Sequence, residues 1–541
     1  MPRLRVGRGR VGLARAAGAF LVVSTAVAVG AMSCAGAGGH GQSAQVRLAA
    51  RVRLPASAVS VLVGAPDVVA AGVALRLFAS APVVIVASPD RPGDVAAAVS
   101  QSLRAHAPLL LTSGGAGLTA SGTGKRAAAR TMARIAPAGS SAPGSAVSAV
   151  LRDQIKTLDP QAVLAVGVVG SVLAAALPGI RVVTSPAMLP ATTAPAPPGH
   201  LVLLVHRGDQ GAATLAAAAS ARVAGARVIP VRGADPRADP AAIAALAAAR
   251  PQAVLAIGAG FGPAGRLASR ISVAETGVQL PGGGQVLFPR RLLVALYGDP
   301  GTPALGVLGQ QGLQASIARA RRVAAAYRAL SHMPVIPAFE IIATVAQAHP
   351  GSDGNYSSEA TVDSLRPWVR RARAAGIYVI LDLQPGRASL LAQARRYRAL
   401  LRLPDVGLAL DPEWKLQPGQ LPLQQIGSVS ITEVNSVIRW LAGLTARYRL
   451  PQKLLVLHQF RLSMISNEQR LDTRHEDLAI LIHMDGQGTP GNKEQTWEAV
   501  FRAAPAGVFF GWKDFYVKDH PMLGPRQTIQ RTPRLSMISY Q

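Results

Sequence analysis

The stretch VGLALDPEW, residues 406–414, decides how the second half of the chain is interpreted. A short apolar run typical of a buried strand is followed at once by Asp411, Glu413 and Trp414. Six further stretches have this form, and segments with the apolar spacing of helices separate them. They occupy residues 292–300, 334–342, 377–386, 453–460, 478–486 and 507–515. The pattern predicts a series of β-α units.

Seven such units over roughly 250 residues predict a (β/α)8 barrel, which we place in residues 285–541. The segment GGQVLFP, residues 283–289, is the candidate for the eighth strand. A doubly wound open sheet is the structural alternative, because it also alternates strands with helices.

The carboxyl ends of the predicted strands carry carboxylates, histidines, amides and aromatic rings. In a barrel these ends meet at one face, where the loops build the site. We therefore expect a shared substrate-binding site at that face. Its candidate residues are Tyr297, Asp299, Glu340, Asp382, Gln384, Asp411, Glu413, Trp414, His458, Gln459, His483, Asp485, Trp512 and Asp514.

Paired carboxyls suit glycosidic cleavage, since one protonates the leaving oxygen and a second stabilises the cationic centre. The barrel resembles glycoside-hydrolase barrels in two ways. In the chitinase-like D-x-E pattern Glu413 is the acid and Asp411 orients it, although Val406 and Ala409 replace the two earlier acids. In the retaining two-carboxylate pattern Glu413 pairs with Asp514. Both resemblances make Glu413 catalytic.

A metal-dependent alternative would use His458, His483 and Asp485 as a His₂-carboxylate set. Neither the H-x-x-x-H nor the H-E-x-x-H spacing accompanies these residues in the sequence. We therefore predict neither a metal nor another cofactor for the barrel.

The first half of the chain repeats itself. PQAVLAVG at residues 160–167 returns as PQAVLAIG at residues 251–258, and each copy follows a helix-like segment. Wholly apolar strands that alternate with Ala-rich helices predict parallel sheets covered on both faces. We expect a repeated, flavodoxin-like α/β module in residues 58–284.

A family resemblance rests on VVIVASPDRPGDVAAAVSQSLRAHAPLLLTS, residues 83–113, and on the first PQAVLAVG copy that follows. Asp94 stands at a helix start, Thr112 follows the LLL run, and Gly167 ends the next strand. This order resembles the cell-wall-binding repeat (type 2) of Gram-positive surface proteins, and the second copy keeps an acid at Asp209. The resemblance implies non-covalent attachment to an anionic wall polymer.

GFGPAG, residues 260–265, matches the G-x-G-x-x-G pattern of dinucleotide-binding loops. The sequence places no acid after a following strand at the required distance, and the first copy of the repeat lacks the pattern. We interpret these glycines as sites where a helix packs closely, and we predict no nucleotide cofactor.

The beginning of the chain predicts export. An arginine-rich start, an apolar run over residues 16–31 and AMSC at residues 31–34 resemble a signal peptide with a lipobox, in which Cys34 receives a lipid. Cys34 is the single cysteine, so the chain cannot form an internal disulfide. Residues 35–57 are then a flexible tether. We expect a lipoprotein on the extracellular face of the membrane or in the cell wall, with secretion as the alternative.

The formal net charge of +28 favours anionic partners. A nucleic-acid-binding motif does not accompany the charge in this sequence, so we expect an anionic wall polymer or glycan as partner and no nucleic acid. Two functions stay open: hydrolysis of a wall glycan by the barrel, and non-catalytic binding of the wall or of carbohydrate.

Overall fold

The computed structural model describes residues 47–112 and 147–541. The predicted export signal in residues 1–34, with its lipidation site Cys34, lies outside the described residues. Among the helices of the two described ranges, none combines the length and the hydropathy needed to cross a membrane.

The last part of the predicted tether, residues 35–57, is bound to the first domain where the structure describes it. β1 (Leu48–Ala49) pairs with β9 (Thr192–Thr193), and β2 (Arg51–Val52) pairs with β4 (Phe78–Ser80). Residues 48–52 of the predicted tether are therefore held by backbone pairing.

The first half of the chain forms two sheets, each of four parallel strands. Their orders are β6-β5-β7-β8 and β11-β10-β12-β3. The first sheet contains β5 (Val83–Ala87), β6 (Leu109–Leu111), β7 (Ala162–Val166) and β8 (Arg181–Val183). The second contains β3 (Val59–Leu62), β10 (Leu201–His206), β11 (Arg227–Val231) and β12 (Ala253–Ile257). The two PQAVLA motifs form β7 and β12, which hold the same place in the two sheets.

Alanine-rich helices connect these strands. They are α1 (Pro66–Leu77), α2 (Pro92–Arg104), α3 (Ala149–Leu158), α4 (Gly170–Ala176), α5 (Ala212–Val223), α6 (Pro240–Ala249) and α7 (Ala264–Ala274). One apolar cluster includes Val84 and Leu203 from the two sheets together with Val73 of α1 and Ala217 of α5. Small side chains allow this close approach of helix to sheet, which explains the high alanine content.

One glycine of GFGPAG lies at a close contact. The Phe261 ring stacks on His206 with ring centroids 4.5 Å apart. Gly260 and the preceding Gly258 leave room for this imidazole, because a Cβ at either position would approach it to about 3.1–3.2 Å. A Cβ at Gly262 or Gly265 would meet open space, so our interpretation of the glycines as packing residues holds for Gly260 and not for the other two.

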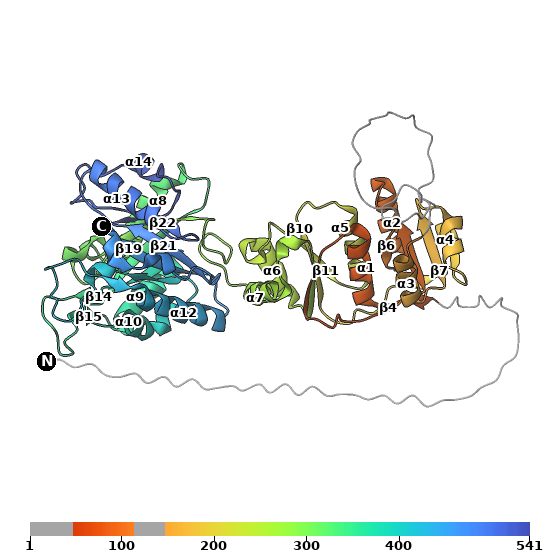
Figure 1. The fold of residues 1–541 in the computed structure, drawn as a ribbon, viewed down its shortest axis with the longest axis horizontal. Coiled ribbons are helices and arrows are strands. Elements are labelled where there is room, and N and C mark those ends of the chain that lie inside the picture. Colours follow the sequence, from red (N-terminus) through yellow and green to blue (C-terminus); the bar gives the residue numbers. More distant parts are fainter. Residues whose placement is uncertain (1–46, 113–146) are drawn as a thin grey trace, which may run out of the picture. The chain divides into compact units, whose positions relative to one another are not determined.

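The second half of the chain forms a closed barrel of eight parallel strands, labelled in part in Figure 1. The strands are β13 (Leu292–Gly298), β14 (Val335–Ala346), β16 (Tyr378–Leu383), β17 (Val406–Leu410), β19 (Lys453–Gln459), β21 (Leu478–Met484), β22 (Phe509–Asp514) and β23 (Leu535–Tyr540). β23 pairs with β13 and so closes the ring, while β15 (Ser357–Glu359) adds an antiparallel edge to β14. The predicted (β/α)8 barrel is confirmed, and the open sheet is excluded.

The prediction of the eighth strand is wrong. Residues 283–289 form no strand, and the barrel is completed instead by LSMISY in β23. Gly283 and Gly284 adopt positive φ angles of 86° and 76°, which interrupts an extended backbone. The apolar residues after them, Leu287 and Phe288, fold into the inner core of the barrel. Leu287 and Phe288 are therefore apolar because they fill the inside of the barrel, not because they belong to a strand.

Helices on the outside of the barrel follow most of its strands. They are α8 (Leu313–Arg328), α9 (Val362–Ala374), α10 (Leu390–Arg396), α11 (Arg398–Leu401), α12 (Ile431–Arg447), α13 (Pro490–Ala503) and α14 (Pro525–Ile529). In α9 the Thr361 hydroxyl accepts a backbone N–H of the first turn, and Leu365, Val369 and Ala372 are buried at helical spacing. This helix thus covers the barrel with one apolar face.

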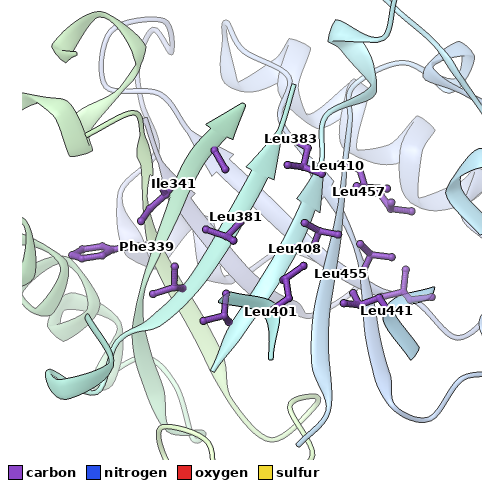
Figure 2. Close-up of a cluster of buried hydrophobic side chains, with 14 of the residues drawn as sticks. Phe339, Ile341, Leu381, Leu383, Leu401, Leu408, Leu410, Leu441, Leu455 and Leu457 are labelled. Carbon is purple, nitrogen blue, oxygen red and sulfur yellow. The ribbon is translucent and has the colours of Figure 1, made fainter. Parts of the chain in front are cut away.

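The alternation of side chains along the strands gives the barrel two apolar layers. The outer layer lies between strands and helices, and Figure 2 shows part of it: Phe339, Leu381, Leu408, Leu455 and, from α12, Leu441. The inner layer includes Ala295, Ile380, Ala409, Val456 and Leu481. Because the inner layer fills the barrel, its carboxyl-terminal end is a closed floor on which a site can be built.

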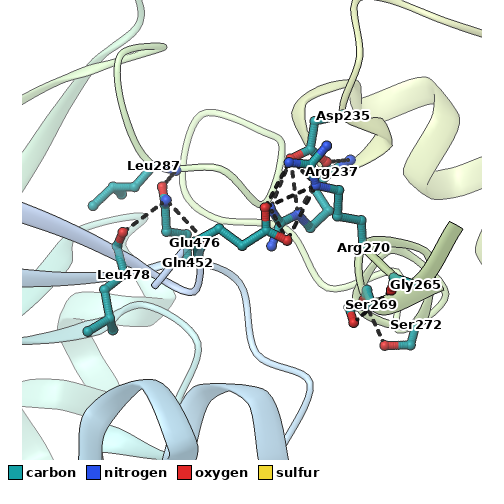
Figure 3. Close-up of polar contacts among 10 residues, drawn as sticks. All are labelled: Asp235, Arg237, Gly265, Ser269, Arg270, Ser272, Leu287, Gln452, Glu476 and Leu478. Carbon is teal, nitrogen blue, oxygen red and sulfur yellow. Dashed lines mark hydrogen bonds and ion pairs between the residues drawn. The ribbon is translucent and has the colours of Figure 1, made fainter. Parts of the chain in front are cut away.

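Charged contacts link the segment before β21 to residues around α7, as Figure 3 shows. Glu476 pairs with Arg270 at 2.7 Å and lies 3.7 Å from Arg237. Arg237 also pairs with Asp235 at 2.9 Å. These side chains are largely or partly shielded from water, so the four charges stabilise one another more than isolated surface pairs do.

Candidate active site

Ionisable side chains point into the carboxyl-terminal end of the barrel because side chains alternate along each strand. In β16, Ile380 belongs to the inner core, and Asp382, two residues later, points into the site. In β19, Val456 belongs to the inner core, and His458, two residues later, points into the site. The groups that face one another here are Tyr297, Glu340, Asp382, Asp411, His458, His483, Asp485 and Lys513.

His458 lies at the centre of this network. Its Nδ1 donates to Asp485 Oδ2 at 3.0 Å, and its Nε2 donates to Glu340 Oε1 at 3.0 Å. Burial opposes protonation of the ring, but these two carboxylates outweigh it and raise the pKa of His458 well above its usual value. The imidazolium therefore holds Asp485 in a fixed position.

Tyr297 and Asp382 form a second hydrogen-bonded pair. The tyrosine hydroxyl donates to Asp382 Oδ2 at 2.8 Å and accepts from Gln384 Nε2 at 3.4 Å. Burial raises the pKa of Asp382 to about 6, although the positive charge of His458 works in the opposite direction. Both residues are completely buried beneath the site.

Asp411, Glu413 and Asp485 bring three carboxyl groups together. One oxygen of each lies within 4.8 Å of the others. Burial, followed by the charge of Asp485, raises the pKa of Glu413 to about 7, while Lys513 and His458 oppose the rise. Burial and the neighbouring Glu413 raise the pKa of Asp411 well above its usual value. Glu413 therefore carries a proton under mildly acidic conditions.

A cavity of about 450 Å³ opens above these groups. Its lining combines carboxyls, amides, aromatic rings and two lysines: Glu413, Asp485, Gln384, Gln487, Gln541, Tyr297, Trp414, Phe460, Phe515, Lys513 and Lys518. Aromatic faces and amides around a protonated carboxyl are suited to a polar ring such as a sugar. Trp414 also lines an adjoining groove with Glu413, Leu423 and Arg461.

Four predicted site residues lie elsewhere. Asp299 accepts from the backbone N–H of Gly301 at 2.7 Å and lines a different hollow. Gln459 donates to Glu468 at 2.9 Å. Trp512 is fully buried in the outer layer, against the ring of Trp497. The fourth is Asp514, which the retaining two-carboxylate pattern paired with Glu413.

Asp514 is not brought together with Glu413. Its Oδ1 accepts from Trp512 Nε1 at 2.7 Å, and its Oδ2 accepts from Thr528 Oγ1 at 3.1 Å. Lys493 of α13 lies 3.7 Å from Oδ1. The carboxyl is therefore engaged on the helix side of the barrel, and the pairing of Glu413 with Asp514 across a scissile bond does not fit the geometry.

Lys513 on β22 was missed by the sequence interpretation, as were several loop residues that line the cavity, namely Phe460, Gln487, Phe515, Lys518 and Gln541. Residues of β22 alternate, so Gly511 and Lys513 face the interior while Trp512 and Asp514 face the helices. The signal was present in FFGWKD, since the residue two positions after the inward Gly511 is the lysine. Position at the strand end alone does not distinguish Lys513 from Asp514, whereas the alternation of side chains does.

The three carboxyls Asp411, Glu413 and Asp485 are also the set that could hold a hard cation such as Mg²⁺ or Ca²⁺, since all their donor atoms are oxygens. The His₂-carboxylate arrangement is less suitable. Both ring nitrogens of His458 donate to carboxylates. His483 Nε2 lies 2.7 Å from Ser539 Oγ, and burial together with the charge of His458 lowers the pKa of His483 well below its usual value.

Comparison with known proteins returned no matching family model and no matching curated protein. The functional argument therefore depends on the geometry of the site.

Proposed function

We propose that the protein is a cell-surface glycoside hydrolase in which Glu413 is the general acid and Asp485 the second carboxylate. The observation that carries the proposal is the raised pKa of Glu413, about 7, beside a second carboxylate at the floor of a cavity lined by aromatic rings and amides. A carboxyl that keeps its proton near neutral pH can protonate the oxygen of a leaving sugar.

Asp485 suits the second role because its Oδ2 accepts a hydrogen bond from the His458 imidazolium, which orients the carboxylate. The carboxyl oxygens of Glu413 and Asp485 lie within 4.8 Å of each other. Such close oxygens favour the compact arrangement of retaining enzymes, whose carboxyl groups lie roughly 5–5.5 Å apart. We therefore expect a covalent glycosyl-enzyme intermediate on Asp485 and retention at the anomeric carbon.

Asp411 would then act through Glu413. It lies among the same three carboxyls, is almost completely buried, and has one oxygen, Oδ1, without a hydrogen-bond partner among the described residues. Burial and the charge of Glu413 raise the pKa of Asp411 well above its usual value, so Asp411 stays protonated beside Glu413. We therefore assign Asp411 a positioning role next to the acid.

The first half of the chain would deliver this activity to the cell wall. Two features support a wall-binding role: the net charge of +28, and the contact of Asp94 with Gly167, two positions that carry the resemblance to the type 2 wall-binding repeat. A lipid on Cys34 would retain the protein at the cell surface, and binding to the wall would raise the effective concentration of its glycans.

The test is release of reducing sugar from purified cell walls. Wild-type protein should release sugar, Glu413→Gln and Asp485→Asn should lower the rate by at least about a hundredfold, and Glu498→Gln, on the exposed face of α13, should not. Asp514→Asn should also keep its activity, because that carboxyl faces the helices. NMR of the first anomer formed would show retention.

Unchanged release by Glu413→Gln would remove this residue as the acid. Wall binding without any release by the wild-type protein would instead support a non-catalytic, carbohydrate-binding surface lipoprotein.

A further inference from the structure

Lys513 is a buried cation that forms no ion pair within the described part of the chain. The residue is 3% exposed, yet it lines the cavity. Its Nζ lies 3.5 Å from the centre of the Tyr297 ring and 5.3 Å from that of Phe515. Among the described residues, no carboxylate oxygen lies within 4.0 Å of this ammonium group.

The other buried lysines of the barrel are differently placed. Lys493 pairs with Asp519 and donates to the carbonyl of Lys513. Lys453 donates to the carbonyls of Leu403 and Val406 at 2.6 and 2.9 Å. A buried ammonium group is costly unless it is paired, and a cation–π contact offsets only part of that cost. Lys513 is therefore the position at which an anion from a ligand would be stabilised most.

The carboxylates around Lys513 already have other partners. Glu340 and Asp485 accept from His458, and Asp382 accepts from Tyr297. Lys513 acts on Asp382 and Glu413 through its charge, without a direct ion pair to either. Among the described residues no carboxylate holds this ammonium group in an ion pair, so it is available to an anion that enters the cavity.

Further cations line the space on either side of Glu413. Lys518, which is exposed, lines the same cavity. Arg461 lines the adjoining groove, which shares Glu413 and Trp414 with the cavity. The acidic residues in these two linings are Glu413 and Asp485. A glycan along this path would therefore pass more positive than negative groups beyond the reacting carboxyls.

We propose that Lys513 binds an anionic substituent, a carboxylate or a phosphate, on the sugar next to the bond that Glu413 protonates. The inference deepens the proposed function, on which it rests, and it defines the substrate class as an anionic glycan. A lysine suits this task because its ammonium is a compact charge that accepts either type of anion.

The experiment measures binding, so that it does not require turnover. Glu413→Gln protein is titrated with short oligosaccharides from the cell wall in three forms: native, carboxyl-reduced and dephosphorylated. We expect native fragments to bind at least about tenfold more tightly than one of the two neutralised forms, and the form that loses affinity identifies the anion.

A double-mutant comparison then assigns the effect to Lys513. Adding Lys513→Met to the Glu413→Gln protein should lower affinity for native fragments by the same factor and should not change affinity for the neutralised form. Lys513→Arg should restore part of the binding. Lys156→Met, a surface change on α3 that alters the net charge equally, is the matched control.

Thermal unfolding separates recognition from a structural role. If Lys513 is unpaired in the free protein, Lys513→Met should keep or raise Tm. The proposal would be overturned by a clear fall in Tm, by equal affinity for all three fragment forms, or by an absence of binding. If binding of the fragments depends on Lys513 but the wild-type protein hydrolyses none of them, the anion site is supported and the proposed glycoside hydrolase activity is rejected.

Discussion

At the scale of single residues, burial determines the chemistry of Glu413. In water a glutamate is ionised at neutral pH, but its position above the inner core and beside Asp485 raises the pKa of Glu413 to about 7. The same surroundings keep His458 charged and His483 neutral, although both are histidines at the ends of neighbouring strands. The two histidines thus differ in protonation state because their neighbours differ.

This pKa predicts the pH dependence of the reaction. Because Glu413 must be protonated to act as the acid, the rate should fall about tenfold per pH unit above about 7. Initial rates of sugar release between mildly acidic and alkaline pH check the prediction. A rate that stays constant through this range would show that another group supplies the proton.

The same group makes stability depend on pH. The pKa of Glu413 is higher in the folded chain, about 7, than the reference value of 4.5, so the folded state binds the proton more tightly. The stabilisation is complete below pH 4.5 and is lost as the pH rises to about 7, by at most about 3 kcal/mol. Glu413→Gln should therefore raise Tm more at pH 8 than at pH 5, relative to wild type. Equal shifts in Tm at the two pH values would contradict the raised pKa.

At the scale of elements, β23 is the strand that closes the barrel. It pairs with β13 on one side and β22 on the other, so it converts an open sheet into a closed ring. Ile538 lies in the middle of both ladders and is completely buried in the outer layer. Closure also supplies Ser539, which contacts His483 below the site.

The variant Ile538→Pro tests this role. It removes a backbone donor from a central strand and should lower the free energy of unfolding by about 3 kcal/mol or more. The control Ile538→Val should lower it by only about 1 kcal/mol. Denaturant titration followed by circular dichroism measures both values. A proline variant as stable as the valine variant would show that the barrel does not need β23 for closure.

At the scale of the whole molecule, the net charge complements the proposed site. A net charge of +28 favours association with anionic polymers independently of the cavity. Recognition of the wall and cleavage of a glycan would then be separate properties, carried by the two halves of the chain.

Wall binding should therefore weaken with salt. Raising the NaCl concentration from about 0.05 M to about 0.5 M shortens the screening length severalfold, so the fraction of protein that sediments with purified walls should fall severalfold. Walls stripped of anionic polymer serve as the control and should bind little protein at either concentration. Binding that is insensitive to salt would argue against electrostatic attachment.

The sequence alone determined the local features of this protein. Apolar runs such as that of β17 and the helical spacing of α9 are properties of neighbouring residues, and they were sufficient for the seven strands, the barrel class and the placement of Glu413 and Asp485 at one face of the barrel. They were not sufficient for the pairing of these two carboxyls, since the sequence patterns paired Glu413 with Asp411 or Asp514. Only the tertiary structure decided which strand closes the barrel and which face each strand-end side chain occupies. Closure depends on pairing between distant segments, and a shift of one residue along β22 exchanges Asp514 for Lys513 in the site. The pKa of Glu413 likewise arises from burial and from residues of other strands. The sequence therefore identifies this carboxyl group but does not show that its pKa is raised.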